Sequence, residues 1–267
     1  MTPPDPIQPV TFGSISGLMK RNLLLFVLAA SLGACAATSP VMEIPVADIS
    51  IVGESFIYRG SIHRESNARL FELAESVDPA PTTLVITSKG GETIAGIELG
   101  RWVFRNRFNV TVTEYCLSSC ANYVFPAGIQ KTLEPSAALA WHGGSMQEKW
   151  DDPCSKIPKA VREQGLRCAD IKKLQWEQLE EFKTAEKSFF AEIGVDQRVT
   201  VLGQDPQYDC RGRTASLGWD YSIEDMGRLG IENIEVRNGE WRPDSPTAGM
   251  TICRVELDAD FSRSSGP

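Results

Sequence analysis

The strongest constraint on the fold is the alternation of short β-like runs with amphipathic helical runs along the first half of the chain. The β-like runs are rich in β-branched and aromatic residues, and the runs between them carry apolar residues at helical spacing. The predicted strands cover residues 49–52, 56–58, 84–87, 110–113 and 137–141, and the predicted helices cover residues 66–76 and 93–105 and begin again at residue 119. Because crossover helices join parallel strands, this order predicts an α/β fold with a mainly parallel sheet.

The second half of the chain continues this pattern less regularly. Residues 170–192 are rich in Glu, Lys and Gln and predict one long helix with a solvated face. Its apolar positions, which we expect to pack on the sheet or on a partner, are Leu174, Leu179, Phe182, Phe189 and Phe190. A short helix over 222–231 and a closing strand over 231–236 complete a predicted domain of residues 49–240. The tail, residues 241–267, is predicted to be partly disordered apart from 249–257.

The N-terminal region has the pattern of an export signal. Lys20 and Arg21 precede an apolar run, residues 23–32, which is too short to span a bilayer comfortably. The following Leu-Gly-Ala-Cys35 resembles a bacterial lipobox, which implies a signal over residues 1–35, a lipid on Cys35 as the mature N-terminus, and a tether over 36–48. The alternative is a simple secretory signal in which Cys35 is incidental.

These features predict a lipoprotein of the bacterial cell envelope that faces the periplasm. The residue after Cys35 is Ala36 rather than Asp, and by resemblance to enterobacterial lipoproteins this favours the outer membrane.

Removing residues 1–34 leaves 25 of the 27 basic and 34 of the 35 acidic residues, a net charge of −9. So acidic a chain has no electrostatic footprint for nucleic acid. The about 230 residues that remain correspond to one domain of ordinary size.

Six of the seven cysteines remain after the lipid-bearing one, and an even number in an exported chain predicts disulfides. Cys154 and Cys168 bracket a charged segment and are expected to form a local bridge. The other four are Cys116, Cys120, Cys210 and Cys253, whose pairing the sequence leaves open. A zinc site is the competing interpretation, but the sequence has one nearby His and no paired C-x-x-C motif, so we predict no metal and no cofactor.

The stretch over residues 114–123, Glu-Tyr-Cys-Leu-Ser-Ser-Cys-Ala-Asn-Tyr, carries the chemistry. It follows a predicted strand and opens a predicted helix, which presents Ser118 or Ser119 as a nucleophile with His142 as a downstream base. Alternatively, both serines merely cap the helix, and His142 is a structural residue.

Three segments together resemble the ClpP/crotonase superfamily of serine peptidases. They are Ser-Lys-Gly-Gly after the strand at 84–87, Cys-Leu-Ser-Ser-Cys at 116–120, and the run from Pro135 to His142. The resemblance is nearest to an exported ClpP-like branch with a Cys-x-Ser-x-Cys stretch at the nucleophile turn. It implies a β-β-α superhelix and Ser-His hydrolysis of peptide bonds. The region over 146–169 departs from the family pattern as an insert that could cover the cleft or form an interface.

The resemblance also implies roles for individual residues. Gly90 and Gly91 correspond to the turn whose amide stabilises the oxyanion. Ser119 stands nine residues before Gly128, which fits the family spacing, whereas Ser118 is the centre of the Cys-x-Ser-x-Cys pattern. We therefore prefer Ser119 as the nucleophile, with the amide of Cys120 as the second oxyanion donor at the start of the helix.

The remaining catalytic positions follow the same resemblance. His142 stands seven residues after Pro135, as the family's His does, and a neutral imidazole there could take the Ser proton. Asp205 is the preferred acid that would orient it, and Asp196 lies where the long helix ends; without an acid a dyad would retain some activity. His63 is expected at the surface.

The sequence thus leads to a lipid-anchored serine peptidase that binds an extended peptide or protein substrate along a strand edge. The alternative is a catalytically inactive ClpP-like scaffold of the envelope in which a Cys116–Cys120 bridge blocks the serines. Acyl-CoA chemistry of the crotonase type needs a cytoplasmic thioester pool and fits an exported lipoprotein badly. Members of the family that the chain resembles often assemble into rings, so a homo-oligomer is one possible state, which the lipid anchor and the insert could prevent.

Overall fold

The computed structural model describes residues 45–150, 152–154, 167–208, 210, 216–246 and 251–263. All of them belong to one unit that runs from Ile44 to Pro267. The predicted signal and lipobox, residues 1–35, the tether up to residue 44 and most of the insert lie outside the described residues. Among the residues that are described, no helix is both long and apolar enough to cross a membrane.

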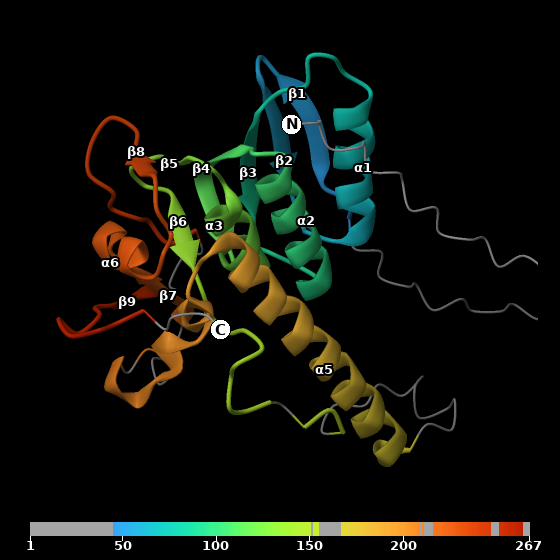
Figure 1. Cartoon of the computed structure of the whole chain (residues 1–267), viewed down its shortest axis with the longest axis vertical. Helices are drawn as coiled ribbons and strands as arrows, with labels where there is room; N and C mark the ends of the chain where they lie inside the picture. The colour runs from blue at the N-terminus through green and yellow to red at the C-terminus, as the bar shows by residue number, and fades with distance from the viewer. Residues whose placement is uncertain are drawn as a thin grey trace, which may run out of the picture. The chain divides into compact units, whose positions relative to one another are not determined.

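A seven-stranded sheet forms the centre of the fold (Figure 1). Its path runs through β1 (Asp48–Val52), β2 (Ser55–Arg59), β3 (Thr83–Ser88), β4 (Asn109–Leu117), β5 (Lys131–Leu133) and β8 (Ile234–Val236), and β6 (Ala138–Ala140) also pairs with β4. Only the β1–β2 pair is antiparallel; every other pair in this sheet is parallel. The predicted mainly parallel sheet is therefore confirmed.

Helices connect the parallel strands, as expected for crossover connections. They are α1 (Arg64–Glu75), α2 (Thr93–Arg105), the π-helix η1 (Cys120–Val124) with α3 (Phe125–Ala127), α5 (Cys168–Ile193), three short 3₁₀ turns η2 (Gln197–Thr200), η3 (Leu202–Gln204) and η4 (Pro206–Tyr208), and α6 (Ile223–Arg228). The α/β fold class is thus confirmed, and α2 spans the residues predicted for it.

A second, two-stranded parallel sheet pairs β7 (Ser216–Tyr221) with β9 (Thr251–Val255). A disulfide between Cys210 and Cys253 joins the segment before β7 to β9. An antiparallel bridge between Trp141 and Trp219, with both N–H···O distances at 2.8 Å, joins this sheet to the strand region that precedes His142. The β9 strand lies in the part of the tail that the sequence set apart as ordered.

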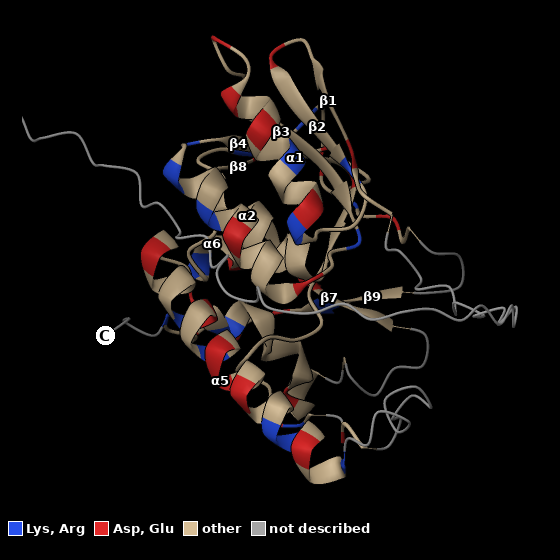
Figure 2. Cartoon of the chain, turned by 90° about the vertical axis from the view of Figure 1, so that its right-hand side faces the viewer, with Lys and Arg blue, Asp and Glu red and all other residues tan. Residues whose placement is uncertain are grey.

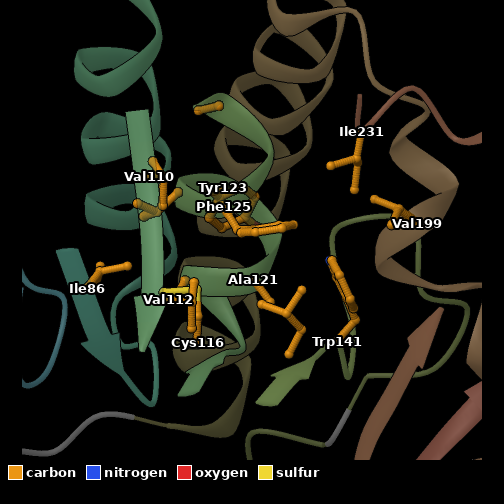
Figure 3. Close-up of a cluster of buried hydrophobic side chains, with 14 of the residues drawn as sticks. Ile86, Val110, Val112, Cys116, Ala121, Tyr123, Phe125, Trp141, Val199 and Ile231 are labelled. Carbon is orange, nitrogen blue, oxygen red and sulfur yellow. A yellow bond between two sulfur atoms is a disulfide. The ribbon is translucent and has the colours of Figure 1, made fainter. Parts of the chain in front are cut away.

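The core packs the π-helix between the sheet and α2 (Figure 3). Val110, Val112 and Cys116 of β4 face Tyr123 and Phe125 across this layer. Close approach is achieved by glycines of α2, since a Cβ at Gly100 would lie 2.4 Å from the carbonyl oxygen of Tyr123. The residues immediately after Ser119 are consequently fixed by a closely packed interior.

The long helix α5 differs from the prediction at two positions. Leu174, expected to pack, is 50% exposed, while Glu186, part of a charge pattern expected to be solvated, is completely buried. Figure 2 shows acidic and basic residues along the whole of α5. The C-terminal part, with Phe189 and Phe190, lies in the core. The spacing of apolar residues in the sequence therefore predicted the helix, but it did not show which of the acidic side chains on α5 is buried.

Two further predictions can be compared with the structure. The expectation that His63 lies at the surface is wrong: its ring is buried and Nδ1 accepts a hydrogen bond from the amide of Ser66, which caps α1. The expected Cys154–Cys168 disulfide is present, and a third bridge joins Cys116 to Cys120. Among the described residues, no three His, Cys, Asp or Glu side chains gather in a way that could hold a metal ion.

Candidate active site

Ser118 occupies a sharp turn between β4 and the π-helix. Its φ of 56° lies in the left-handed region, which a non-glycine residue adopts at a cost of about 1 kcal/mol or more. The amide of Ser118 donates to Ala140 O at 2.9 Å and its carbonyl accepts from the amide of Asn122 at 2.8 Å. The turn is thus held at both ends while the side chain points away from the strand, the arrangement of a nucleophile elbow.

His142 reaches this turn because β4 and β6 are neighbouring parallel strands. Leu117 pairs with Ala140 in the ladder, so Ser118 and His142 leave the same end of the two strands. His142 Nε2 lies 2.7 Å from Ser118 Oγ. This distance is short enough for the imidazole to take the hydroxyl proton.

The structure brings His142 together with Ser118, the alternative nucleophile of the sequence analysis, and not with Ser119. Ser119 is buried, and its Oγ donates to Gly91 O at 2.9 Å. The geometry therefore favours Ser118 over Ser119 as the partner of His142. The physical reason is the positive φ of Ser118, which turns its side chain outward and leaves the next side chain facing the interior.

The Gly90–Gly91 turn lies directly against the Ser118 turn. A Cβ at Gly90 would lie 2.7 Å from Ser118 Cβ and 2.8 Å from the amide nitrogen of Ser119. The Gly90 amide donates to Ser88 Oγ at 3.0 Å, whereas within the described residues the Gly91 amide has no hydrogen-bond acceptor. The predicted oxyanion glycines are thus adjacent to the serine turn. Cys120, predicted as the second donor, begins the π-helix, and the amide that follows Ser118 is that of Ser119.

The Cys116–Cys120 disulfide flanks the serine turn without covering it. Both cysteines are completely buried, and Figure 3 shows Cys116 with its sulfur among the buried side chains. Ser118 remains partly exposed and in contact with His142. The arrangement therefore differs from the blocked serine of the scaffold alternative.

The environment of His142 favours its neutral form. Much of the residue is exposed, yet protein atoms around the ring desolvate the charged form and lower the pKa of His142 below its ordinary value; a hydrogen bond to its own main chain acts in the opposite direction. A neutral imidazole near pH 7 can accept a proton from a serine hydroxyl.

The structure does not join either predicted acid to His142. Asp205 is exposed and its Oδ1 accepts from the Gln207 amide at 3.1 Å, and within the described part of the chain it makes no hydrogen bond or ion pair with His142. Asp196 is buried and forms a two-oxygen ion pair with Arg198. The role of Asp205 as the third catalytic residue therefore stays a prediction, and in the structure its carboxylate accepts from the backbone amide two residues further on.

Residues outside the predicted site hold the His142 loop from the main-chain side. Gln204 Nε2 donates to His142 O at 3.1 Å, and Asn122 Nδ2 donates to Gly143 O at 2.8 Å. The amide of Ser145 donates to Glu186 Oε2 at 2.8 Å. Asn122 lies inside the recognised serine motif and could have been singled out, but nothing in a charge-rich helix distinguishes Glu186.

Comparison with known proteins adds little to this geometry. No protein-family model and no curated protein matches the sequence. Among solved structures, one described as an enoyl-CoA hydratase from Streptomyces coelicolor A3(2) is similar over 39% of this chain and 50% of its own, with 15% identity and a TM-score of 0.27. A second, described as an enoyl-CoA hydratase/isomerase from Novosphingobium aromaticivorans DSM 12444, is similar over 38% and 50%, with 9% identity and a TM-score of 0.30.

This chain therefore spans about half the length of these structures. At these TM-scores the similarity carries no argument about the chemistry. The fold description rests on the strand order and on the parallel pairing given above.

Proposed function

We propose that the chain is a serine hydrolase of ClpP-like type that cleaves peptide bonds, with Ser118 as nucleophile and His142 as general base. The observation that carries this proposal is the 2.7 Å contact between His142 Nε2 and Ser118 Oγ at a residue with positive φ. Strained backbone conformations of non-glycine residues are concentrated at functional sites, and a serine held against a neutral imidazole is the minimal acyl-transfer pair.

The amides of Ser119 and Gly91 are the proposed donors to the oxyanion. Ser119 directly follows the nucleophile, and Gly91 lies on the turn that touches it. Two such donors, aimed at the developing negative charge, contribute several kcal/mol to lowering the barrier, about 3 to 4 each. His142 returns the proton to the leaving amine after the serine has attacked.

A cavity next to His142 suits a substrate side chain. It has a volume of about 280 Å³, and one wall is Gln204, which also binds the His142 carbonyl. Its apolar lining comes from Met146, Val201, Leu202 and Pro206, and its polar and charged lining from Gln147, Glu148, Arg198 and Asp205. A cavity of this composition fits one side chain of a peptide, with an apolar stem and a polar end.

Labelling by a fluorophosphonate probe tests the catalytic proposal. The wild-type chain should be labelled on Ser118, as located by mass spectrometry of the modified peptide, and should cleave members of a quenched fluorescent peptide library. Because the pKa of His142 is lowered, the neutral base predominates at pH 7. The labelling rate should therefore be constant near neutrality and decrease as the pH falls through a value below about 6.5.

A folded wild-type chain that is neither labelled nor hydrolytic would instead support the inactive scaffold. The observation that favours this second candidate is that, within the described residues, no acid contacts the His142 ring.

The proposal includes attachment to the bacterial envelope through a lipid on Cys35, facing the periplasm and more readily at the outer membrane. It is supported by the Leu-Gly-Ala-Cys sequence and the apolar run before it. Expressed in a bacterium with lipoprotein processing, the wild-type chain should be recovered with membranes, and Cys35→Ala should move it to the soluble periplasmic fraction. A Cys35→Ala chain that stays with the membranes would contradict the lipid anchor.

A further inference from the structure

Within the described residues, no acid is among the hydrogen-bond partners of the His142 ring. The ring contacts Ser118 Oγ through Nε2. The orientation of the ring therefore depends on how firmly the peptide groups from His142 to Ser145 are held. That segment contains two glycines, Gly143 and Gly144, and by itself would have wide conformational freedom.

One buried carboxylate holds the far end of this segment. Glu186 of α5 is completely buried, and its Oε2 accepts from the Ser145 amide at 2.8 Å and from Gln197 Nε2 at 2.7 Å. The segment lies directly on it, since a Cβ at Gly144 would be 2.9 Å from Glu186 Oε1. Burying a carboxylate costs several kcal/mol unless its oxygens accept hydrogen bonds, so these two donors help to offset the cost of burying Glu186.

The same carboxylate also contacts the nucleophile side of the site. Glu186 Oε1 accepts from the hydroxyl of Tyr123 at 2.7 Å. Tyr123 belongs to the π-helix that begins two residues after Ser118, and its neighbour Asn122 binds Gly143 O. Glu186 thus links the helix after the serine to the loop after the histidine.

We infer that Glu186 is a positioning residue that sets the His142 ring against Ser118 through the main chain, in place of an acid on the imidazole. The catalytic part of this inference rests on the proposed function. The geometric part does not, because the position of the ring can be measured whether or not the chain is an enzyme.

The test uses Glu186→Gln in the full chain, purified without a histidine tag. An amide keeps the size of the side chain but removes its negative charge and one of its two acceptor oxygens, so it cannot accept from all three donors: either one donor loses its acceptor or the Tyr123 hydroxyl turns round to accept from the NH₂ group. The chain has two histidines, and each gives its own imidazole nitrogen signals in NMR. In the variant, the His142 signals should shift and broaden, while those of His63, which caps α1, stay unchanged.

Labelling kinetics provide the second measurement. The maximal labelling rate constant should fall about 10- to 100-fold, as expected for a small displacement of a reacting group, with the half-saturating probe concentration unchanged. Tyr123→Phe removes one of the three donors and leaves the charge; it should change both measurements in the same direction by less. Should Glu186→Gln not fold, Tyr123→Phe decides the inference.

Asp225→Asn is the matched control. Asp225 is also a buried acid, but it binds Arg228 and the Leu257 amide, away from His142. It should lower stability without changing the His142 signals or the labelling rate of folded protein. Unchanged His142 signals in folded Glu186→Gln or Tyr123→Phe would overturn the inference, whereas a wild type that is not labelled would overturn the proposed function only.

Discussion

Replacing Ser118 with Ala should abolish fluorophosphonate labelling and reduce peptide hydrolysis by about 10⁴-fold or more, the scale at which loss of a catalytic serine acts. The reason is the loss of the hydroxyl that lies 2.7 Å from His142 Nε2. His142→Ala should have an effect of similar size, because the proton would then have no acceptor at that distance. Labelling rates and peptide turnover measure both losses.

Ser119→Ala is the matched control one residue away. It removes the buried hydrogen bond to Gly91 O and should cost about 1 kcal/mol of stability while labelling on Ser118 persists. Loss of labelling in Ser119→Ala together with its retention in Ser118→Ala would restore the assignment based on sequence spacing.

Gly90→Ala should both destabilise the chain and remove its reactivity. Gly90 has a φ of 89°, and a Cβ there would lie 2.7 Å from Leu117 O and from Ser118 Cβ. One of these contacts is backbone and the other is the first atom of the nucleophile, so neither can move aside without displacing the turn. The free energy of unfolding should fall by about 3 kcal/mol or more, and folded protein should label poorly.

Gly53→Ala separates the conformational cost from the contact. Gly53 also has a positive φ, 57°, but a Cβ there meets nothing within 4 Å. Its replacement should cost about 1 kcal/mol and leave labelling unchanged. Denaturant unfolding of the two variants gives the comparison; equal losses of stability would show that the contact of Gly90 with the serine turn is unimportant.

The sequence predicted those parts of the fold that repeat a simple pattern. Residues 93–105 carry apolar residues at helical spacing over more than three turns, and α2 covers all of them. By contrast, β5 has only Lys131, Thr132 and Leu133, and it is a strand because β4 and β8 pair with it on both sides. The extension of β4 to Leu117 likewise depends on pairing with β6. Such strands depend on tertiary contacts more than on local propensity.

The candidate site likewise has parts that the sequence predicted and parts that it did not. The sequence identified the serine pair, His142 and the Gly90–Gly91 turn, because each belongs to a spaced motif. It could not choose between Ser118 and Ser119, since the choice depends on the sign of one φ angle and on hydrogen bonds to Ala140 and Gly91. The role of Glu186 could not be predicted from the sequence for a related reason. Its hydrogen-bond partners are Tyr123, Ser145 and Gln197, which are uncharged and lie on other segments of the chain.

The pairing of Leu117 with Ala140 makes the spacing between Ser118 and His142 a property of a strand ladder. In a ladder the relative position of two residues is fixed by the hydrogen bonds of their neighbours, not by the length of chain that joins them. Insertions at the exposed positions Gln130 and Ser136, on either side of β5, should consequently leave the serine–histidine distance unchanged. The reactive pair is thereby insulated from the part of the chain where length variation is easiest to accommodate.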